Sequence, residues 1–130
     1  MTYLLDANVL IAWYVEEHAD HEKASHWINS NQDILLICPT AQGSLFRYLI
    51  RDGKPASTAA NVTASMLEFR RCHWVPDDLG YQDVRWDGVV GHHQVTDVYL
   101  ADLARKYGAL LATFDKGIAG LRPDATYLIS

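Results

Sequence analysis

Three aspartates stand where the chain is expected to leave a β-strand or to begin a helix. Asp6 follows the apolar run at residues 3–5. Asp115 follows a second apolar run, at residues 109–113, and Asp97 lies in the first turn of a strong helical pattern. Because strand ends and helix starts gather at one edge of a parallel sheet, we expect these three carboxylates to converge although they are far apart in sequence.

Converging carboxylates point to metal-dependent phosphoryl chemistry. They repel one another, and the pKa of at least one rises unless a cation neutralises the cluster. Hard oxygen ligands favour Mg²⁺ or Mn²⁺ over metals that prefer nitrogen or sulfur. A divalent ion can activate water and stabilise the charge that develops in phosphoryl transfer. Asp6, Asp97 and Asp115 are therefore the candidate metal ligands and catalytic residues of a nuclease or phosphatase.

Each aspartate also has a structural explanation. An Asp after a strand can cap the next helix, and an Asp in a first helical turn complements the helix dipole. For any one position the two explanations are evenly balanced. The occurrence of all three at equivalent places favours the metal site for the set.

The elements that must position these residues are indicated by short apolar runs that alternate with longer helical patterns. This alternation favours an α/β fold with a parallel sheet and helices on both faces. The expected strands are Tyr3–Leu5, Ile34–Cys38, His73–Val75, Ala109–Thr113 and, at the edge of the sheet, Tyr127–Ile129. The expected helices are Val9–Val15 capped by Asn8, His21–Asn29, one that Thr40 caps and that runs to about Ile50, Thr58–Arg70, and one that Thr96 opens and Gly108 ends.

Composition limits the function classes. The 130 residues suit one domain, 49% of them are apolar, and no apolar run approaches the roughly 20 residues of a membrane span. The start of the chain lacks the features of a secretory signal, so we expect a cytoplasmic protein without a membrane partner.

A net charge of −5 argues against tight non-specific nucleic-acid binding, but it suits a basic protein partner. Cys38 and Cys72 are expected to be free thiols, since neither lies in a paired metal-binding motif.

Three segments carry a resemblance to a known family: Leu4–Ile11, Val95–Leu100 and Leu111–Gly117. They resemble the acidic motifs of PIN-domain ribonucleases, and their spacing resembles that of the VapC toxins of type II toxin–antitoxin pairs. The resemblance covers essentially the whole chain, 1–130, as a single PIN domain. It implies a three-layer α/β/α sandwich around a mainly parallel sheet. It also implies Mg²⁺- or Mn²⁺-dependent endoribonuclease activity on tRNA or rRNA, neutralisation by a cognate antitoxin, and a homodimer.

One position departs from the family pattern. Relatives usually carry a fourth acid, a Glu early in the helix after the second strand, and the matching residue here is Gln42. Glutamine keeps one carbonyl oxygen but loses the charge. We count Gln42 among the catalytic residues and expect weaker metal binding than in relatives with four acids. The alternative is that Gln42 is an ordinary polar residue of the helix.

Five further residues are candidate contacts to an RNA substrate: Thr96, Thr113, Arg47, His92 and Lys116. Helix capping, strand propensity and solvated surface charge are the alternatives for them, and Arg47 could equally meet acidic groups of an antitoxin. His92 and His93 are adjacent, so they are expected to point apart on a helix and not to share a metal.

Other functions fit less well. A receiver domain needs an Asp pair near its first strand, whereas Asp6 stands alone. A phosphatase of the haloacid dehalogenase type needs Asp-x-Asp, and Asn8 replaces the second Asp. A degenerate, non-catalytic PIN domain that binds an antitoxin or RNA stays open because of Gln42.

Overall fold

The computed structural model describes residues 1–130, and its centre is a sheet in which every pair of neighbouring strands is parallel. The strand order is β3-β2-β1-β4-β5. The strands are β1 (Thr2–Leu5), β2 (Ile34–Ile37), β3 (Cys72–Trp74), β4 (Leu110–Thr113) and β5 (Thr126–Leu128). The predicted α/β fold is confirmed, and the last strand lies at an edge as expected.

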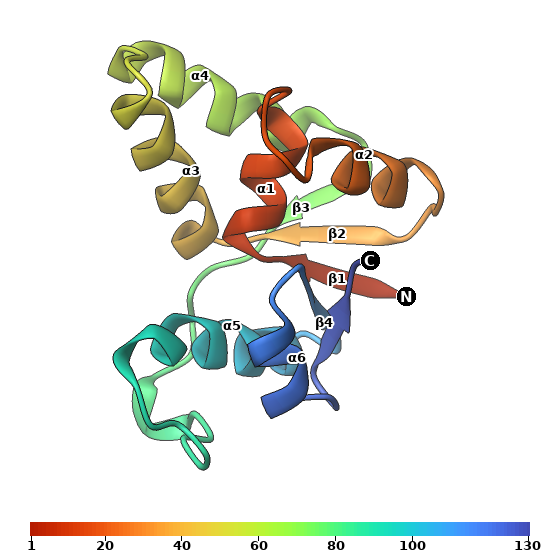
Figure 1. Cartoon of the computed structure of the whole chain (residues 1–130), viewed down its shortest axis with the longest axis vertical. Helices are drawn as coiled ribbons and strands as arrows, with labels where there is room; N and C mark the ends of the chain where they lie inside the picture. Colours follow the sequence, from red (N-terminus) through yellow and green to blue (C-terminus); the bar gives the residue numbers. More distant parts are fainter.

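Helices cover both faces of this sheet (Figure 1). The helices on one side are α1 (Ala7–Tyr14), α2 (His21–Asn29), α3 (Pro39–Arg51) and α4 (Ala56–Ser65), and those on the other are α5 (Val95–Lys106) and α6 (Lys116–Leu121). Three short 3₁₀ turns complete the chain: η1 (Met66–Glu68), η2 (Tyr81–Asp83) and η3 (His92–Gln94). None of the helices has the length and apolar character needed to span a bilayer.

The central strands are continuous apolar runs because both of their faces are covered. Leu5, Leu35 and Leu111, one from each of β1, β2 and β4, are fully buried. Cys38 and Cys72 are buried free thiols, as predicted.

Two predicted helix caps are wrong. In both cases the observed cap lies two residues earlier, directly after the strand and in extended conformation. Asp6 caps α1, with its Oδ1 accepting from the Ala7 amide at 2.8 Å, so Asn8 lies inside the helix. At α3, Cys38 occupies the cap position and the helix begins at Pro39. Proline suits a first helical position because the missing N–H would have no partner there.

The other boundary errors concern helices that begin or end in tight turns. α5 begins at Val95, directly after η3, so Thr96 is its second residue and not its cap. The helix predicted over Thr58–Arg70 begins earlier, as α4, and passes into η1 after Ser65. The short helix α6, which the sequence pattern did not indicate, follows Asp115.

The register of the sheet brings two distant segments side by side at the carboxyl edge. In the β1–β4 pairing, Leu5 lies opposite Ala112, and the Asp6 amide donates to the Ala112 carbonyl at 3.0 Å. Asp6 and Thr113 therefore leave the sheet together, and this edge is where the site must be sought.

Candidate active site

Asp6 is the most buried carboxylate of the site, with 4% of its surface exposed. The Thr113 hydroxyl donates to its Oδ2 at 2.7 Å, and the Ala7 amide donates to Oδ1. Burial nevertheless raises the pKa of Asp6. The two hydrogen bonds oppose that rise, whereas the charge of Asp115 adds to it. Both oxygens therefore have a donor, and the side chain is fixed in orientation.

Asp115 caps α6 and is tied to Asp6 through Thr113. Its Oδ1 accepts from the Gly117 amide at 2.7 Å, and its own amide donates to Thr113 Oγ1 at 3.0 Å. Thr113 is fully buried, so its hydroxyl bridges the two aspartates and has no surface for the predicted RNA contact.

Asp97 completes the group from the first turn of α5. Its pKa is raised to about 7, first by burial, then by the charges of Asp6 and Asp115 and by the nearby Asp115 side chain. Asp97 and Asp115 also line one cavity of about 150 Å³. The charges of Asp6 and Asp115 thus contribute to the raised pKa of Asp97.

The donor chemistry of the three aspartates fits a hard divalent cation. All three offer carboxylate oxygens, and a cation among them would remove the repulsion that raises the pKa of Asp97. No three acidic, His or Cys side chains already converge as a set of metal ligands. Thr113 and Ala7 hold Asp6 in place, and Asp97 and Asp115 line the neighbouring cavity.

Gln42 lies in the first turn of α3, and its side chain is engaged elsewhere. Its Oε1 accepts a hydrogen bond from the indole N–H of Trp74 at 3.1 Å, and it makes no hydrogen bond to the three aspartates. Trp74, at the end of β3, is 49% exposed. The contact joins residues 32 positions apart, and no sequence signal pointed to it.

The side chains of His92 and His93 are oriented differently from the prediction. The rings of His92 and His93 lie 3.9 Å apart between centroids, so the two side chains lie together and do not point apart. The reason is that they occupy the tight turn η3 and not a regular α-helix. Both side chains are exposed, and it is His93 that lines the cavity beside Asp97 and Asp115.

Gln94 was missed by the sequence analysis and also lines this cavity. Its Oε1 accepts from the amides of Val90 and Gly91, at 2.7 and 2.9 Å. These bonds order the chain just before α5. A Gln three residues after a turn-forming Gly is a capping pattern that could have been recognised.

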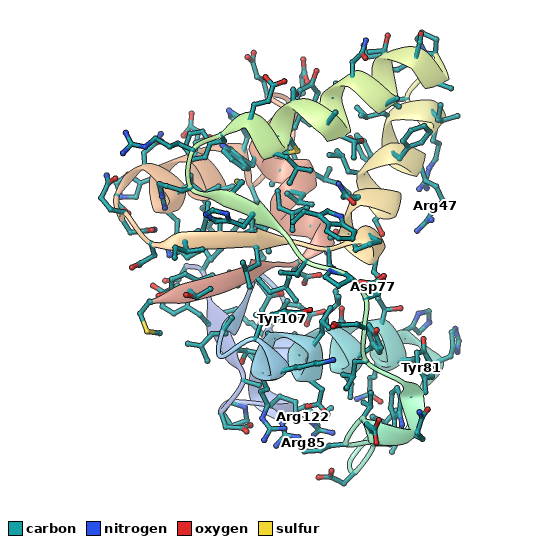
Figure 2. All side chains as sticks on the ribbon, turned by 180° about the vertical axis from the view of Figure 1, so that it is seen from behind. Arg47, Asp77, Tyr81, Arg85, Tyr107 and Arg122 are labelled. Carbon is teal, nitrogen blue, oxygen red and sulfur yellow. The ribbon has the colours of Figure 1, made fainter.

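The remaining candidates lie on the surface. Arg47 is exposed on α3, projects outward in Figure 2, and donates to Ser44 Oγ at 3.3 Å. Thr96 and Lys116 are exposed and are the sequence neighbours of Asp97 and Asp115. Their contacts with RNA stay a prediction.

Comparison with known proteins gives consistent matches. A family model described as the PIN domain matches residues 3–122. The chain is 46% identical over 129 residues to Ribonuclease VapC29 of Mycobacterium tuberculosis, covering 99% of this chain and 97% of that protein. It is 31% identical over 144 residues to Ribonuclease VapC39 of the same organism, covering 92% of each.

Two solved structures share the fold at low sequence identity. One is the crystal structure of Mycobacterium tuberculosis VapC20, described as a sarcin-ricin loop cleaving toxin, with a TM-score of 0.69 at 15% identity over 92% of this chain and 94% of that one. The other is the crystal structure of VapBC2 from Rickettsia felis bound to a promoter DNA fragment, with a TM-score of 0.67 at 16% identity over 97% and 96%.

Proposed function

The chain belongs to the PIN-domain family as a VapC-type ribonuclease toxin, and from this premise we propose that it is an endoribonuclease dependent on Mg²⁺ or Mn²⁺. The proposed substrate is structured RNA, either tRNA or rRNA, and the reaction is hydrolysis. The observation that carries this proposal is that Asp97 and Asp115 line one cavity, while Thr113 links Asp115 to the buried Asp6 through hydrogen bonds.

Asp6, Asp97 and Asp115 would hold the divalent ion, which when bound supplies charge stabilisation and an activated water for attack on phosphorus. Asp6 is held in place by Thr113 and Ala7, so it needs no reorganisation during the reaction. Without a cation the pKa of Asp97 is raised to about 7. A bound divalent ion would favour its charged form and so keep Asp97 available as a ligand at neutral pH.

The surroundings of the site suit an RNA backbone. Arg47, Thr96, His92 and Lys116 are the proposed contacts to RNA phosphates, since all four are exposed. His93 joins this set because it lines the cavity beside the acids.

Family membership also supports proposals about partners. A cognate antitoxin would neutralise the chain, and the net charge of −5 suits a basic antitoxin segment. Further proposals are a homodimer, a cytoplasmic location and a single PIN domain over residues 1–130. The single domain is supported by one continuous core, to which both helical layers contribute.

The experiment that tests the proposed function is cleavage of purified tRNA and rRNA with Mn²⁺, with Mg²⁺, or with EDTA. The wild-type chain is expected to cleave with metal and not with EDTA, and Asp6→Ala is expected to lose the activity. Asp52→Ala is the control, because Asp52 is an exposed carboxylate at the far end of α3. No cleavage by the wild type with either metal would contradict the proposal.

The alternative is a non-catalytic PIN domain that binds an antitoxin or RNA, and Gln42 is the observation that favours it. If only Gln42→Glu cleaves RNA in the same assay, the natural chain is an inactivated nuclease. If the wild type cleaves, the alternative is excluded.

Gln42→Glu is expected to tighten Mn²⁺ binding by about tenfold, because it restores a carboxylate at the position where PIN-domain relatives carry a fourth acid. The new carboxylate can still accept the Trp74 indole N–H, so the local structure should persist. Calorimetric titration of both proteins with Mn²⁺ checks this expectation. Gln82→Glu, at an exposed position in η2, controls for the added charge. Equal affinities of the wild type and Gln42→Glu would show that Gln42 lies outside the metal site.

A further inference from the structure

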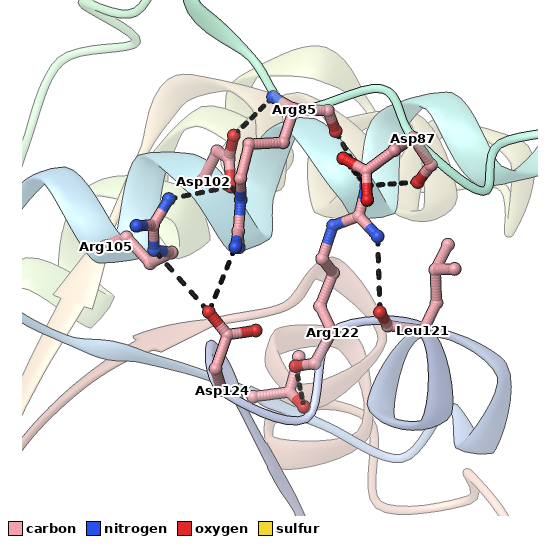
Figure 3. Close-up of polar contacts among 8 residues, drawn as sticks. Arg85, Asp87, Asp102, Arg105, Leu121, Arg122 and Asp124 are labelled. Carbon is pink, nitrogen blue, oxygen red and sulfur yellow. Dashed lines mark hydrogen bonds and ion pairs between the residues drawn. The ribbon is translucent and has the colours of Figure 1, made fainter.

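Arg122 is a buried arginine whose hydrogen bonds go to the backbone of a distant turn. It is 3% exposed and directly follows α6. Its Nη2 donates to the carbonyls of Arg85 and Asp87, both at 2.7 Å, and its Nη1 donates to the Leu121 carbonyl at 3.2 Å (Figure 3). Burying a guanidinium is costly unless its N–H groups donate hydrogen bonds. Because the donors of Arg122 bind the turn, they hold it against the end of α6.

The same turn is fixed to α5 from its other side. The Arg85 amide donates to Asp102 Oδ2 at 2.7 Å, and Arg85 Nε donates to Asp102 Oδ1 at 3.0 Å. Asp102 lies on α5 and is 5% exposed. Arg85 therefore connects α5 to α6, and we call the three residues the Arg122–Arg85–Asp102 bridge.

The bridge joins the two helices that present the candidate metal ligands. Asp97 lies five residues before Asp102 on α5, about 7.5 Å along the helix axis. Asp115 caps α6 at its beginning, and Arg122 follows the end of the same helix. A rotation of α6 relative to α5 would therefore separate Asp115 from Asp97, and the bridge opposes that rotation.

A packing contact of the same turn also forms the wall of the cavity. Gly88 has a φ of +82°, and a Cβ on it would lie 2.7 Å from Leu121 Cδ1. Leu121 lines the cavity together with Asp97 and Asp115. Only glycine allows the turn to approach α6 this closely.

We propose that Arg122 is a positioning residue for the metal site, which holds α6 against the turn at residues 85–88 and thereby keeps Asp115 facing Asp97. This inference rests on the proposed function, because it assigns a role within that site. Arg122 itself touches no reacting group. Its effect is carried by Arg85 and Asp102, through hydrogen bonds that lie outside the cavity.

The test compares Arg122→Gln with Arg105→Gln. Arg105 pairs with Asp102 at 3.5 Å and with Asp124 at 3.8 Å, but it makes no hydrogen bond or ion pair with the turn at residues 85–88 or with α6, so its replacement changes the charge equally. Arg122→Gln is expected to weaken Mn²⁺ binding by about tenfold or more, as removal of supporting residues around metal sites does. Arg105→Gln is expected to bind as the wild type does, and Arg122→Lys to lie between.

Hydrogen exchange provides a readout that does not depend on metal. The Gly117 amide, which donates to Asp115, is expected to exchange faster in Arg122→Gln relative to the amides of α3. Uniformly faster exchange would mean a general loss of stability and would overturn the positioning role, as would exchange and Mn²⁺ binding both equal to the wild type.

Gly88→Ala tests the packing of the turn against Leu121 without changing charge, and it provides a second measurement if Arg122→Gln does not fold. Its Cβ should displace Leu121, accelerate exchange at Gly117 and weaken Mn²⁺ binding. Unchanged exchange at Gly117 in Gly88→Ala would overturn the inference. If the wild type itself bound no Mn²⁺, the proposed function would fail, and the exchange result would still decide whether Arg122 positions Asp115.

Discussion

Replacing Asp97 with asparagine is expected to lower metal-dependent RNA cleavage by at least about 100-fold and also to stabilise the protein measured in EDTA at neutral to alkaline pH. Activity falls because the site loses one of its three carboxylates. Stability rises because asparagine removes a charge that burial and the neighbouring Asp6 and Asp115 make unfavourable. Replacing a residue whose only role is to stabilise the fold would lower stability instead.

The pH dependence follows from the raised pKa of Asp97. Its pKa is about 7 in the folded protein against 3.8 for an ordinary Asp, so the folded state binds more protons between these values. The free energy of unfolding of the wild type should therefore fall as the pH rises from about 4 to about 7, and this contribution should be missing in Asp97→Asn. We expect a gain of about 1–2 kcal/mol for the variant above about pH 7, since water partly screens this half-exposed charge.

Urea unfolding of both proteins across this pH range, in EDTA, measures the effect. Asp52→Asn is the matched control, because Asp52 is exposed and removed from the site. Parallel pH profiles for the wild type and Asp97→Asn would show that the three aspartates do not repel one another in the folded protein.

Thr113→Val is expected to cost about 2–4 kcal/mol of unfolding free energy, although valine has nearly the same shape as threonine. The Thr113 hydroxyl donates to Asp6 and accepts from the Asp115 amide, and it is fully buried. Valine would leave a buried carboxylate oxygen and an amide without these partners. Mn²⁺ affinity should fall as well, since Asp6 would lose its fixed orientation.

Two further substitutions test whether the expected loss comes from the hydrogen bond between Thr113 and Asp6. Thr126→Val removes a hydroxyl from β5 that donates to the Arg122 carbonyl at 2.9 Å, so it deletes a bond to a neutral acceptor. It is expected to cost about 1 kcal/mol. Thr113→Ser keeps the hydroxyl and should retain most of the Mn²⁺ affinity. Equal losses of unfolding free energy for the two valine variants would mean that the bond to Asp6 stabilises the fold no more than a bond to a neutral acceptor does.

The parts of the fold that could be predicted from sequence depend on local patterns. The runs at residues 3–5 and 34–37 indicated buried strands because both faces of the sheet are covered. Asp6 and Asp115 could be placed at one edge because parallel strands end there together. The placement of Asp6 and Asp115 at the same sheet edge could therefore be predicted without any contact information.

The parts that could not be predicted are contacts between residues distant in sequence. Trp74 reaches Gln42 across 32 positions, and Arg122 reaches Arg85 across 37, without a spacing rule that relates either pair. The histidine pair was misplaced because a 3₁₀ turn, with its tighter winding, stands where an α-helix was assumed. These contacts decide how the acids are held, whereas local patterns decide where they lie.

The central claim is that Asp6, Asp97 and Asp115 together bind one divalent ion. Calorimetric titration of Mn²⁺ into the wild type and Asp97→Asn at about pH 8, above the pKa of about 7 of Asp97, tests it most directly. The account predicts saturable binding by the wild type and at least about tenfold weaker binding by the variant. Equal Mn²⁺ affinities for the two proteins would contradict it.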